Sequence, residues 1–192
     1  MSSKSSVMSG KPKISGAVFR APLGTPIPTD ARTALDVAFI EQGYVSSEGW
    51  SRQINKAYNT INAWGGDEVA RSRTEHGVGF SFSLIEDLNS EVQKSKFGAA
   101  AVVVAPATAS KGRQVTVTYK GEDTDPSVWV FDMNDQGKLH RTVFFDAVDT
   151  TESFEQTFSD EDVISLPFEM TAYKGPTGAW FVDYTDDGKL SA

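Results

Sequence analysis

The stretch "TINAWGGDEVARSRTEHGVGFSFSLIEDLNSEVQKSKFG" (residues 60–98) decides how the rest of the chain is interpreted. It begins as a polar loop broken by glycines around Trp64, continues as a charged strand, and then becomes a strictly alternating strand. Phe80, Phe82 and Leu84 occupy every second position, so they share one face, as the two-residue period of a β-strand requires. We therefore predict a half-buried strand whose apolar face is turned to the core.

A short helix is expected directly after this strand. Asp87 or Asn89 can cap its first turn, because a side-chain oxygen there accepts a hydrogen bond from a free backbone N–H. Leu88 and Val92 stand four positions apart and are expected on one helical face. Gly98 occupies the position at which glycine commonly ends a helix. A helix of about ten residues needs tertiary packing to persist, so it should lie against a sheet.

The remainder of the chain consists of strand and turn patterns. Strands are expected at residues 14–22 and 37–46, and a hairpin is expected to turn at residues 134–137. We count about eight or nine strands and one helix, which predicts a mainly β protein, a sandwich or barrel with one flanking α-helix. We take residues 1–192 as a single domain. The later strands are expected in "AAAVVVA", "GRQVTVTYKGE", "PSVWVFDMNDQGKLHRTVFFDAV" and a closing pair, "VISLPFEMTAYKG" with "GAWFVDYTDDG".

Two segments depart from this pattern. Residues 1–13 are rich in Ser, Lys and Gly and predict a flexible N-terminal arm. Residues 47–76 form a long polar segment, expected to be partly strand. Loops of that length inside a compact domain are uncommon and are usually functional or disordered. The segment is too ordered in pattern for a linker and too polar for core, so its size needs a functional explanation.

Composition restricts the classes of function. The net charge is −8 and the sequence pI is about 4.8, whereas nucleic-acid binders carry a basic stripe because phosphate neutralisation drives their affinity. The absence of cysteine excludes disulfides and thiolate metal sites and fits a reducing cytoplasm. The longest apolar run, residues 99–105, is far shorter than the roughly 18 residues that span a bilayer. Residues 1–13 lack the apolar core of a signal peptide. We expect no membrane association.

No set of residues for nucleophilic or zinc chemistry is recognisable. His76 and His140 are the only histidines, and there is no H-E-x-x-H motif. The sequence "GFSFS" (residues 79–83) lacks the final glycine of a nucleophile elbow and lies inside an alternating strand, not at a strand-to-helix turn. Neither a phosphate-binding P-loop nor a dinucleotide-binding glycine motif occurs. We expect no catalytic and no cofactor-binding residues.

Acidic residues offer two weaker signals. "DMNDQG" (residues 132–137) begins like a calcium loop, but Val143 stands where the bidentate glutamate is required, and a hairpin turn explains the same residues. The acidic clusters at residues 122–125, 159–162 and 183–187 leave a paired-carboxylate site open. We interpret them as solvated turns between strands, and expect no metal site and no enzyme.

Four pieces of the first half resemble a known family. They are "GAVFRAPLGTPIPTD", "FIEQGYVSSEGW", "INAWGGDEVARSRTE" and "FSFSLIEDLNSEVQKSKFG", which fall in this order within residues 15–98. In these pieces the chain is similar to the major tail tube proteins of long-tailed (siphovirus-like) bacteriophages, notably those that infect actinobacteria. The second half is similar more loosely, by its strand order and by "VFFDAV".

The resemblance implies a structural role in a virion. The family has a β-sandwich or barrel fold with a flanking helix, which the tube protein of type VI secretion shares. Its members form hexameric rings that stack into a hollow tail tube through which DNA passes without specific binding. Implied partners are further copies of the chain, the tape measure protein, the tail terminator and the baseplate or distal tail proteins. The protein would be made in the bacterial host cytoplasm and reside in the virion tail, and no additional immunoglobulin-like domain is expected.

The resemblance also implies which segment joins the rings. In the family, the long segment between the second and third strands reaches towards the neighbouring ring, and its counterpart here is residues 47–76. Aromatic anchors dominate interface energetics, and arginines paired with acidic turns set register. Core burial would explain the aromatic residues equally well, and a solvated strand face would explain the arginines. The candidate inter-ring residues are Trp50, Arg52, Tyr58, Trp64, Arg71 and Arg73.

Two other functions remain open at this point. One is the tube protein of a related contractile injection or secretion system. The other is a monomeric β-sandwich module that binds carbohydrate or a cell surface, which would present an exposed aromatic platform. Both kinds of tube protein would have a segment that becomes ordered when it joins copies of the chain. The monomeric binding module would have no such segment.

Overall fold

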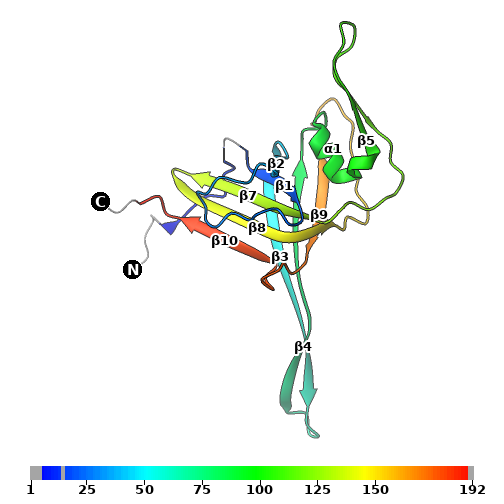
Figure 1. The fold of residues 1–192 in the computed structure, drawn as a ribbon. Coiled ribbons are helices and arrows are strands. Elements are labelled where there is room, and N and C mark those ends of the chain that lie inside the picture. The colour runs from blue at the N-terminus through cyan, green and yellow to red at the C-terminus, as the bar shows by residue number, and fades with distance from the viewer. Residues whose placement is uncertain (1–5, 14–15, 190–192) are drawn as a thin grey trace.

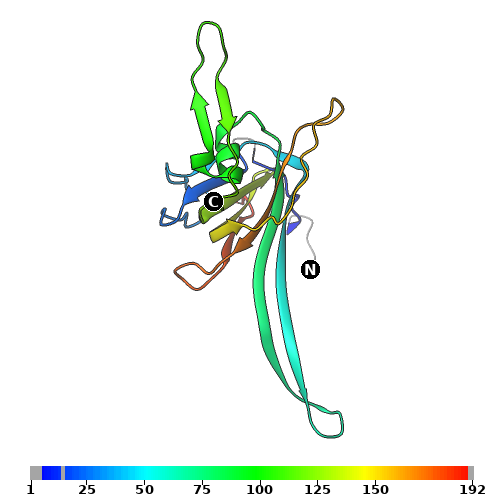
Figure 2. The same cartoon turned by 90° about the vertical axis from the view of Figure 1, so that its right-hand side faces the viewer.

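A computed structural model of the chain describes residues 6–13 and 16–189 (Figures 1 and 2). Within these residues the protein is mainly β, with one α-helix, α1 (Ser90–Phe97), and a 3₁₀ turn at Ala99–Ala101. No helix there is long and apolar enough to cross a membrane. The strands are β1 (Val18–Pro22), β2 (Ile40–Glu41), β3 (Val45–Asn62), β4 (Glu68–Leu84), β5 (Val102–Ala105), β6 (Gln114–Val117), β7 (Ser127–Asp135), β8 (Lys138–Asp149), β9 (Leu166–Ala172) and β10 (Phe181–Asp186).

Eight of these strands form one antiparallel sheet in the order β2-β1-β7-β8-β9-β4-β3, with β10 paired to β8. Strand β8 is the branch point, because residues 139–144 pair with β10 and residues 147–149 pair with β9. The predicted hairpin of β7 and β8 is confirmed. The predicted pairing of the last two strands with each other is wrong, since β9 pairs with β4 and β8, and β10 pairs with β8.

The aromatic core shows that the sheet curls over itself. Phe80 of β4 stacks on Phe144 of β8 with ring centroids 3.9 Å apart, although these strands are not hydrogen-bonded neighbours. Trp50 of β3 likewise stacks on Phe131 of β7 at 4.6 Å. The expected alternation in β4 is confirmed, because Phe80, Phe82 and Leu84 are all buried in this core. The mainly β architecture with a flanking helix therefore follows from one layer of interdigitated rings.

Helix α1 has the predicted caps. The Asn89 side chain accepts a hydrogen bond from the Glu91 backbone N–H, and the Gly98 N–H donates to the Lys94 carbonyl at 3.0 Å. The prediction that Leu88 and Val92 share one face of the helix is wrong, because Leu88 precedes the helix, and its side chain is 85% exposed whereas Val92 is buried. An apolar residue just before the N-cap often packs on the fourth residue of the helix. Here the fourth residue is Gln93, which is polar and offers Leu88 no apolar contact.

A buried lysine holds α1 against the sheet. Lys96 is the basic partner of Asp149, with Nζ to Oδ2 at 2.9 Å, and it also donates to the Pro167 carbonyl at 2.6 Å. The side chains of Lys96 and Asp149 are 3% and 9% exposed. Because a buried charge is tolerated only when it is paired and hydrogen-bonded, this contact fixes α1 to β8 and β9.

One sequence expectation about the N-terminal half is corrected. The strand expected over residues 37–46 is reduced to β2 and the start of β3, because Gly43 adopts a left-handed conformation (φ 75°) that breaks the extended backbone. The described part of the N-terminal arm, residues 6–13, has contacts along β7. Its Lys11 is 3.2 Å from Asp135, and Pro12 is bridged to Met133. Residues 1–5 lie outside the described residues.

Candidate functional site, a projecting β-ribbon

Strands β3 and β4 continue well beyond the rest of the sheet. They pair with each other as far as Asn62 and Glu68, whereas β9 pairs only with Val78–Leu84 of β4. Residues 55–76 therefore form a two-stranded ribbon that projects from the body, and no third strand lies beside it in the described part of the chain (Figures 1 and 2). At about 3.3 Å per residue, the eight residues of β3 and the nine residues of β4 in this segment extend it by roughly 30 Å. We call residues 55–76 the ribbon.

A tight turn closes the ribbon. The Ala63 N–H donates to the Asp67 carbonyl at 2.8 Å, and the Gly66 N–H donates to the Ala63 carbonyl at 3.0 Å. Gly65 and Gly66 have φ angles of 122° and 98°, which residues with a side chain rarely adopt. The hairpin turn therefore requires Gly65 and Gly66, which in the sequence had suggested an irregular loop. The long polar segment predicted at residues 47–76 is ordered β-structure through most of its length.

The ribbon presents different chemistry on its two faces. Tyr58 pairs with Arg73, and Thr60 pairs with Arg71, so these side chains share one face. The Arg71 guanidinium lies 5.7 Å from the Tyr58 ring centroid and pairs with Glu68 at 3.3 Å. Ser72 and Ala70 pair with Asn59 and Ile61 on the opposite, nearly uncharged face. We call Lys56, Tyr58, Arg71 and Arg73 the basic face.

A pKa shift shows the effect of the basic face on its surroundings. Desolvation lowers the pKa of His76, and the positive charges of Arg73, Lys56 and Lys174 lower it further. His76 also contacts the Trp180 ring, with centroids 4.4 Å apart. His76 therefore lies near three basic side chains in a protein of net negative charge.

The tip of the ribbon exposes apolar surface. Trp64 is fully exposed, and Tyr58, Ile61 and Val69 are each at least half exposed. An isolated two-stranded ribbon is marginally stable in water, because it buries too little apolar area to offset the ordering of its backbone. Exposed aromatic and aliphatic residues gathered on such an element mark an interaction site. The ribbon is consequently the strongest candidate for a functional surface.

The structure divides the six predicted interface residues into two groups. Tyr58, Arg71 and Arg73 lie together on the basic face, and Trp64 lies at the tip. Trp50 packs into the core against Phe131. Arg52 lies at the root of the ribbon and makes contacts within the chain. Packing against the core thus explains Trp50, and ion pairing within the chain explains Arg52, without an interface.

The contacts of Arg52 anchor the ribbon to the body. Its Nη1 is 2.9 Å from Asp183 Oδ2, and its guanidinium lies 4.0 Å from the Phe181 ring centroid. Thr142 donates to Asp183 Oδ1 at 2.6 Å, and His140 approaches the same oxygen at 3.4 Å. Sequence inspection missed this cluster, because its members come from β3, β8 and β10. No local signal connects Arg52 with a residue 131 positions away.

The cluster does not form a catalytic triad. A triad needs the base to accept the proton of the nucleophile and the acid to orient the base. Here the Thr142 hydroxyl donates directly to Asp183, whose charge is already balanced by Arg52. Thr142 is also fully buried. Among the described residues, no three His, Cys, Asp or Glu side chains are placed to hold a metal ion.

We expect Asp183→Asn to lower the free energy of unfolding by about 1.5 kcal/mol at neutral pH, because hydrogen bonds to a charged group are lost. Burial raises the pKa of Asp183, but hydrogen bonds from Thr142 and Arg52 outweigh it and leave the pKa below its usual value. The stabilisation is therefore present above the unfolded-state pKa and is lost as the pH falls through the folded-state pKa. Urea unfolding of both proteins from neutral to acidic pH would show the difference in their free energies of unfolding shrinking in acid. A difference that stays constant with pH would contradict the stabilising role of the ionised Asp183.

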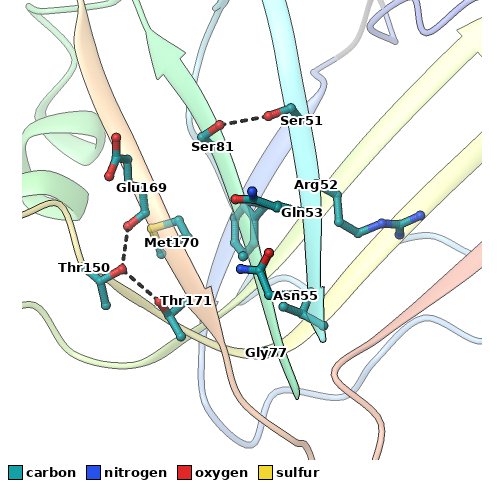
Figure 3. Close-up of a pocket in the computed structure, with 13 residues that line it drawn as sticks. Ser51, Arg52, Gln53, Asn55, Gly77, Ser81, Thr150, Glu169, Met170 and Thr171 are labelled. Carbon is teal, nitrogen blue, oxygen red and sulfur yellow. Dashed lines mark hydrogen bonds between the residues drawn. The ribbon is translucent and has the colours of Figure 1, made fainter. Parts of the chain in front are cut away.

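A polar trough occupies the outer face of the sheet beside the ribbon root (Figure 3). Its volume is about 660 Å³, and β3, β4 and β9 form its walls. Ser51 and Ser81 are hydrogen-bonded at 2.9 Å, and Thr150 and Thr171 at 2.9 Å. Phe80 is the one aromatic residue that lines it, and its ring belongs to the buried core. The trough thus lacks the aromatic platform expected of a carbohydrate-binding module.

The chain matches no protein-family model, and no curated protein matches it significantly.

Proposed function

We propose that this chain is the subunit of a hollow tail tube of a long-tailed bacteriophage, in which hexameric rings stack end to end and DNA passes through the lumen. The ribbon is the observation that carries the proposal. It is an ordered element of roughly 30 Å that has no third strand beside it among the described residues and that exposes apolar side chains at its tip. A second protein surface that packs against the ribbon would explain both its order and its exposed apolar side chains.

The direction of the ribbon favours a stack over a closed dimer. It leaves the body at one end, away from α1 and the β5–β6 hairpin (Figure 1). A contact between one end of a subunit and the other end of the next is heterologous, and such contacts repeat without closing when the rotation does not complete a ring. Repetition of this contact along one axis produces a tube.

Free strand edges support association around a ring. Strand β3 ends the order of the large sheet, so its outer edge carries no strand among the described residues. An unpaired edge offers a row of backbone N–H and C=O groups to another chain. Pairing between neighbouring subunits would extend the sheets around the ring and remove an edge that otherwise invites irregular association.

Charge and composition agree with a conduit for DNA. Each subunit contributes a net charge of −8, so a ring repels the phosphate backbone and gains little from counterion release. The same reasoning applies to the tube of a related contractile injection or secretion system, which stays the second candidate. Implied partners are the tape measure, tail terminator and distal tail proteins, and the proposed location is the virion tail.

Electron microscopy of the purified protein at rising concentration tests the proposal. We expect hollow tubes of uniform width, or rings, because the same two contacts are available to every copy. Sedimentation velocity at the same concentrations measures the fraction assembled. A monomer at all concentrations, including after addition of preformed tail ends from a lysate, would contradict the proposal and favour a binding module.

A further inference from the structure

An apolar groove lies at the end of the molecule opposite the ribbon tip. Strand β4 runs from the tip at Glu68 to Leu84, and the groove starts at the next residue, Ile85. The far end of this strand lies beside α1 in both views (Figures 1 and 2). The volume of the groove is about 830 Å³, within the range of roughly 300–1,000 Å³ of ligand pockets. We call it the α1 groove; its lining is Ile85, Glu86, Asp87, Leu88, Asn89, Arg113, Val163 and Ile164.

The walls of the α1 groove are apolar and held in place. Leu88 and Val163 are 85% and 61% exposed, although both are aliphatic. The turn that carries Leu88 is fixed, because the Asn89 N–H donates to the Glu86 carbonyl at 3.0 Å and Gln93 Nε2 donates to the Asp87 carbonyl at 2.7 Å. The side chain of Leu88 is therefore displayed by a rigid turn.

The rim of the α1 groove is acidic. Glu86 and Asp87 line it, and the exposed acids of residues 160–162 directly precede Val163. Arg113 is the one basic lining residue, and its guanidinium is engaged by Ser90 Oγ. Within the described part of the chain, none of these five acids forms an ion pair with a lysine or arginine. The basic face of the ribbon offers the opposite charge, and Arg73 and Lys56 form no ion pair with a described residue.

Other occupants fit less well. The described residues nearest the termini lie elsewhere, since the Val7 carbonyl accepts from Lys138 and Gly188 lies against Gly137, both at the β7–β8 turn. That turn is distant from α1 (Figure 1). A nucleic acid is disfavoured by the acidic rim. An aromatic tip, with arginines further back along the same ribbon opposite Thr60 and Tyr58, matches both the apolar walls and the rim.

We infer that the α1 groove of one copy receives the Trp64 tip of the next copy, with Arg71 and Arg73 near the acidic rim. This rests on the proposed end-to-end assembly and names the receiving surface. The tip supplies the aromatic anchor, the groove supplies a preformed pocket, and the charges fix the register of the contact. Because tip and groove lie at opposite ends of β4, every copy donates one contact and receives one.

Cysteine crosslinking tests this pairing directly, since the chain has no native cysteine. The variant Ala63→Cys/Val163→Cys places one thiol beside Trp64 and one in the groove, and leaves Trp64 and Leu88 intact. We expect mild oxidation of the concentrated protein to give a ladder of dimers, trimers and higher multimers on a non-reducing gel. A chain with only one thiol cannot pass the dimer. Trp64→Ala in the same background should slow formation of the ladder at least about ten-fold.

The matched control is Ala63→Cys/Thr177→Cys, whose second thiol lies in the exposed β9–β10 turn at the root end of the ribbon. A ladder in the groove variant and none in the control supports the inference, whether or not tubes are visible. Tubes of normal width without a ladder would overturn the groove assignment and leave the proposed function standing. Absence of both tubes and ladder would overturn the groove assignment and the proposed function together. Equal ladders in the groove variant and the control would overturn the groove assignment, because the contact would not be specific to the groove.

Discussion

A chain in which an Asn-Gly turn replaces residues 57–75 is expected to fold and to lose the stacking of rings into tubes completely. Lys56 and His76 are direct cross-strand partners, so a two-residue turn of this type joins them without disturbing the sheet. The core is unaffected, because its β4 members lie between Val78 and Leu84. The removed segment contains the tip and most of the basic face, which leaves the neighbouring ring without its anchor.

The measurement combines electron microscopy with circular dichroism and thermal unfolding. The shortened protein should keep a cooperative transition and the near-ultraviolet signal of its core aromatics, and it should sediment as a monomer or as single rings. Ser72→Ala is a suitable control, because it changes the nearly uncharged face of the ribbon and should leave the tubes intact. Normal tubes from the shortened chain would refute the assembly role of the ribbon.

Arg141→Ala is expected to destabilise the monomer by about 3–5 kcal/mol, because it leaves a buried carboxylate without its main partner. Arg141 and Asp132 are almost fully buried, and two guanidinium nitrogens contact the two carboxylate oxygens at 2.6 and 2.7 Å. The remaining nitrogen donates to the Thr33 carbonyl at 2.6 Å and so ties the loop before β2 to the sheet. Lys13, 3.6 Å from Asp132, offers partial compensation and favours the lower end of the range.

Urea unfolding at neutral pH measures this loss. Arg71→Ala is the control, since the Arg71 side chain is 59% exposed and its ion pair with Glu68 should contribute less than about 1 kcal/mol. The double variant Arg141→Met/Asp132→Leu should recover most of the loss, because replacing both partners leaves no uncompensated charge. A loss below about 1 kcal/mol for Arg141→Ala would show that the pair is not buried in solution.

Ion pairs with exposed partners contribute less to stability than the buried pair of Arg141 and Asp132. Arg32 donates to Asp186 and, by this hydrogen bond above all, holds the pKa of Asp186 at about 2. The carboxylate thus stays ionised at any ordinary pH, and water screens its contribution to stability. The backbone N–H of Ser9 similarly lowers the pKa of Asp135 and helps to hold the described part of the N-terminal arm on β7.

Local patterns in the sequence were sufficient for the elements themselves. The alternation of Phe80, Phe82 and Leu84 predicted the inward face of β4, because side chains of a strand alternate between its faces. Asn89 and Gly98 predicted the ends of α1, because capping depends on residues adjacent to the helix. The turn at residues 134–137 followed from the backbone preferences of Asn, Asp and Gly. Each of these signals is complete within about a dozen residues.

The tertiary structure alone decided which elements meet. It packed Trp50 against the core and paired Arg52 with Asp183, and it divided β8 between β9 and β10. It also showed that the ribbon and the α1 groove lie at opposite ends of β4. Strand partners and buried ion pairs depend on contacts between residues far apart in the chain, and many pairings satisfy the same local pattern. Only the packing of the aromatic core selects one of them, and that choice leaves the ribbon without a third strand among residues 6–13 and 16–189.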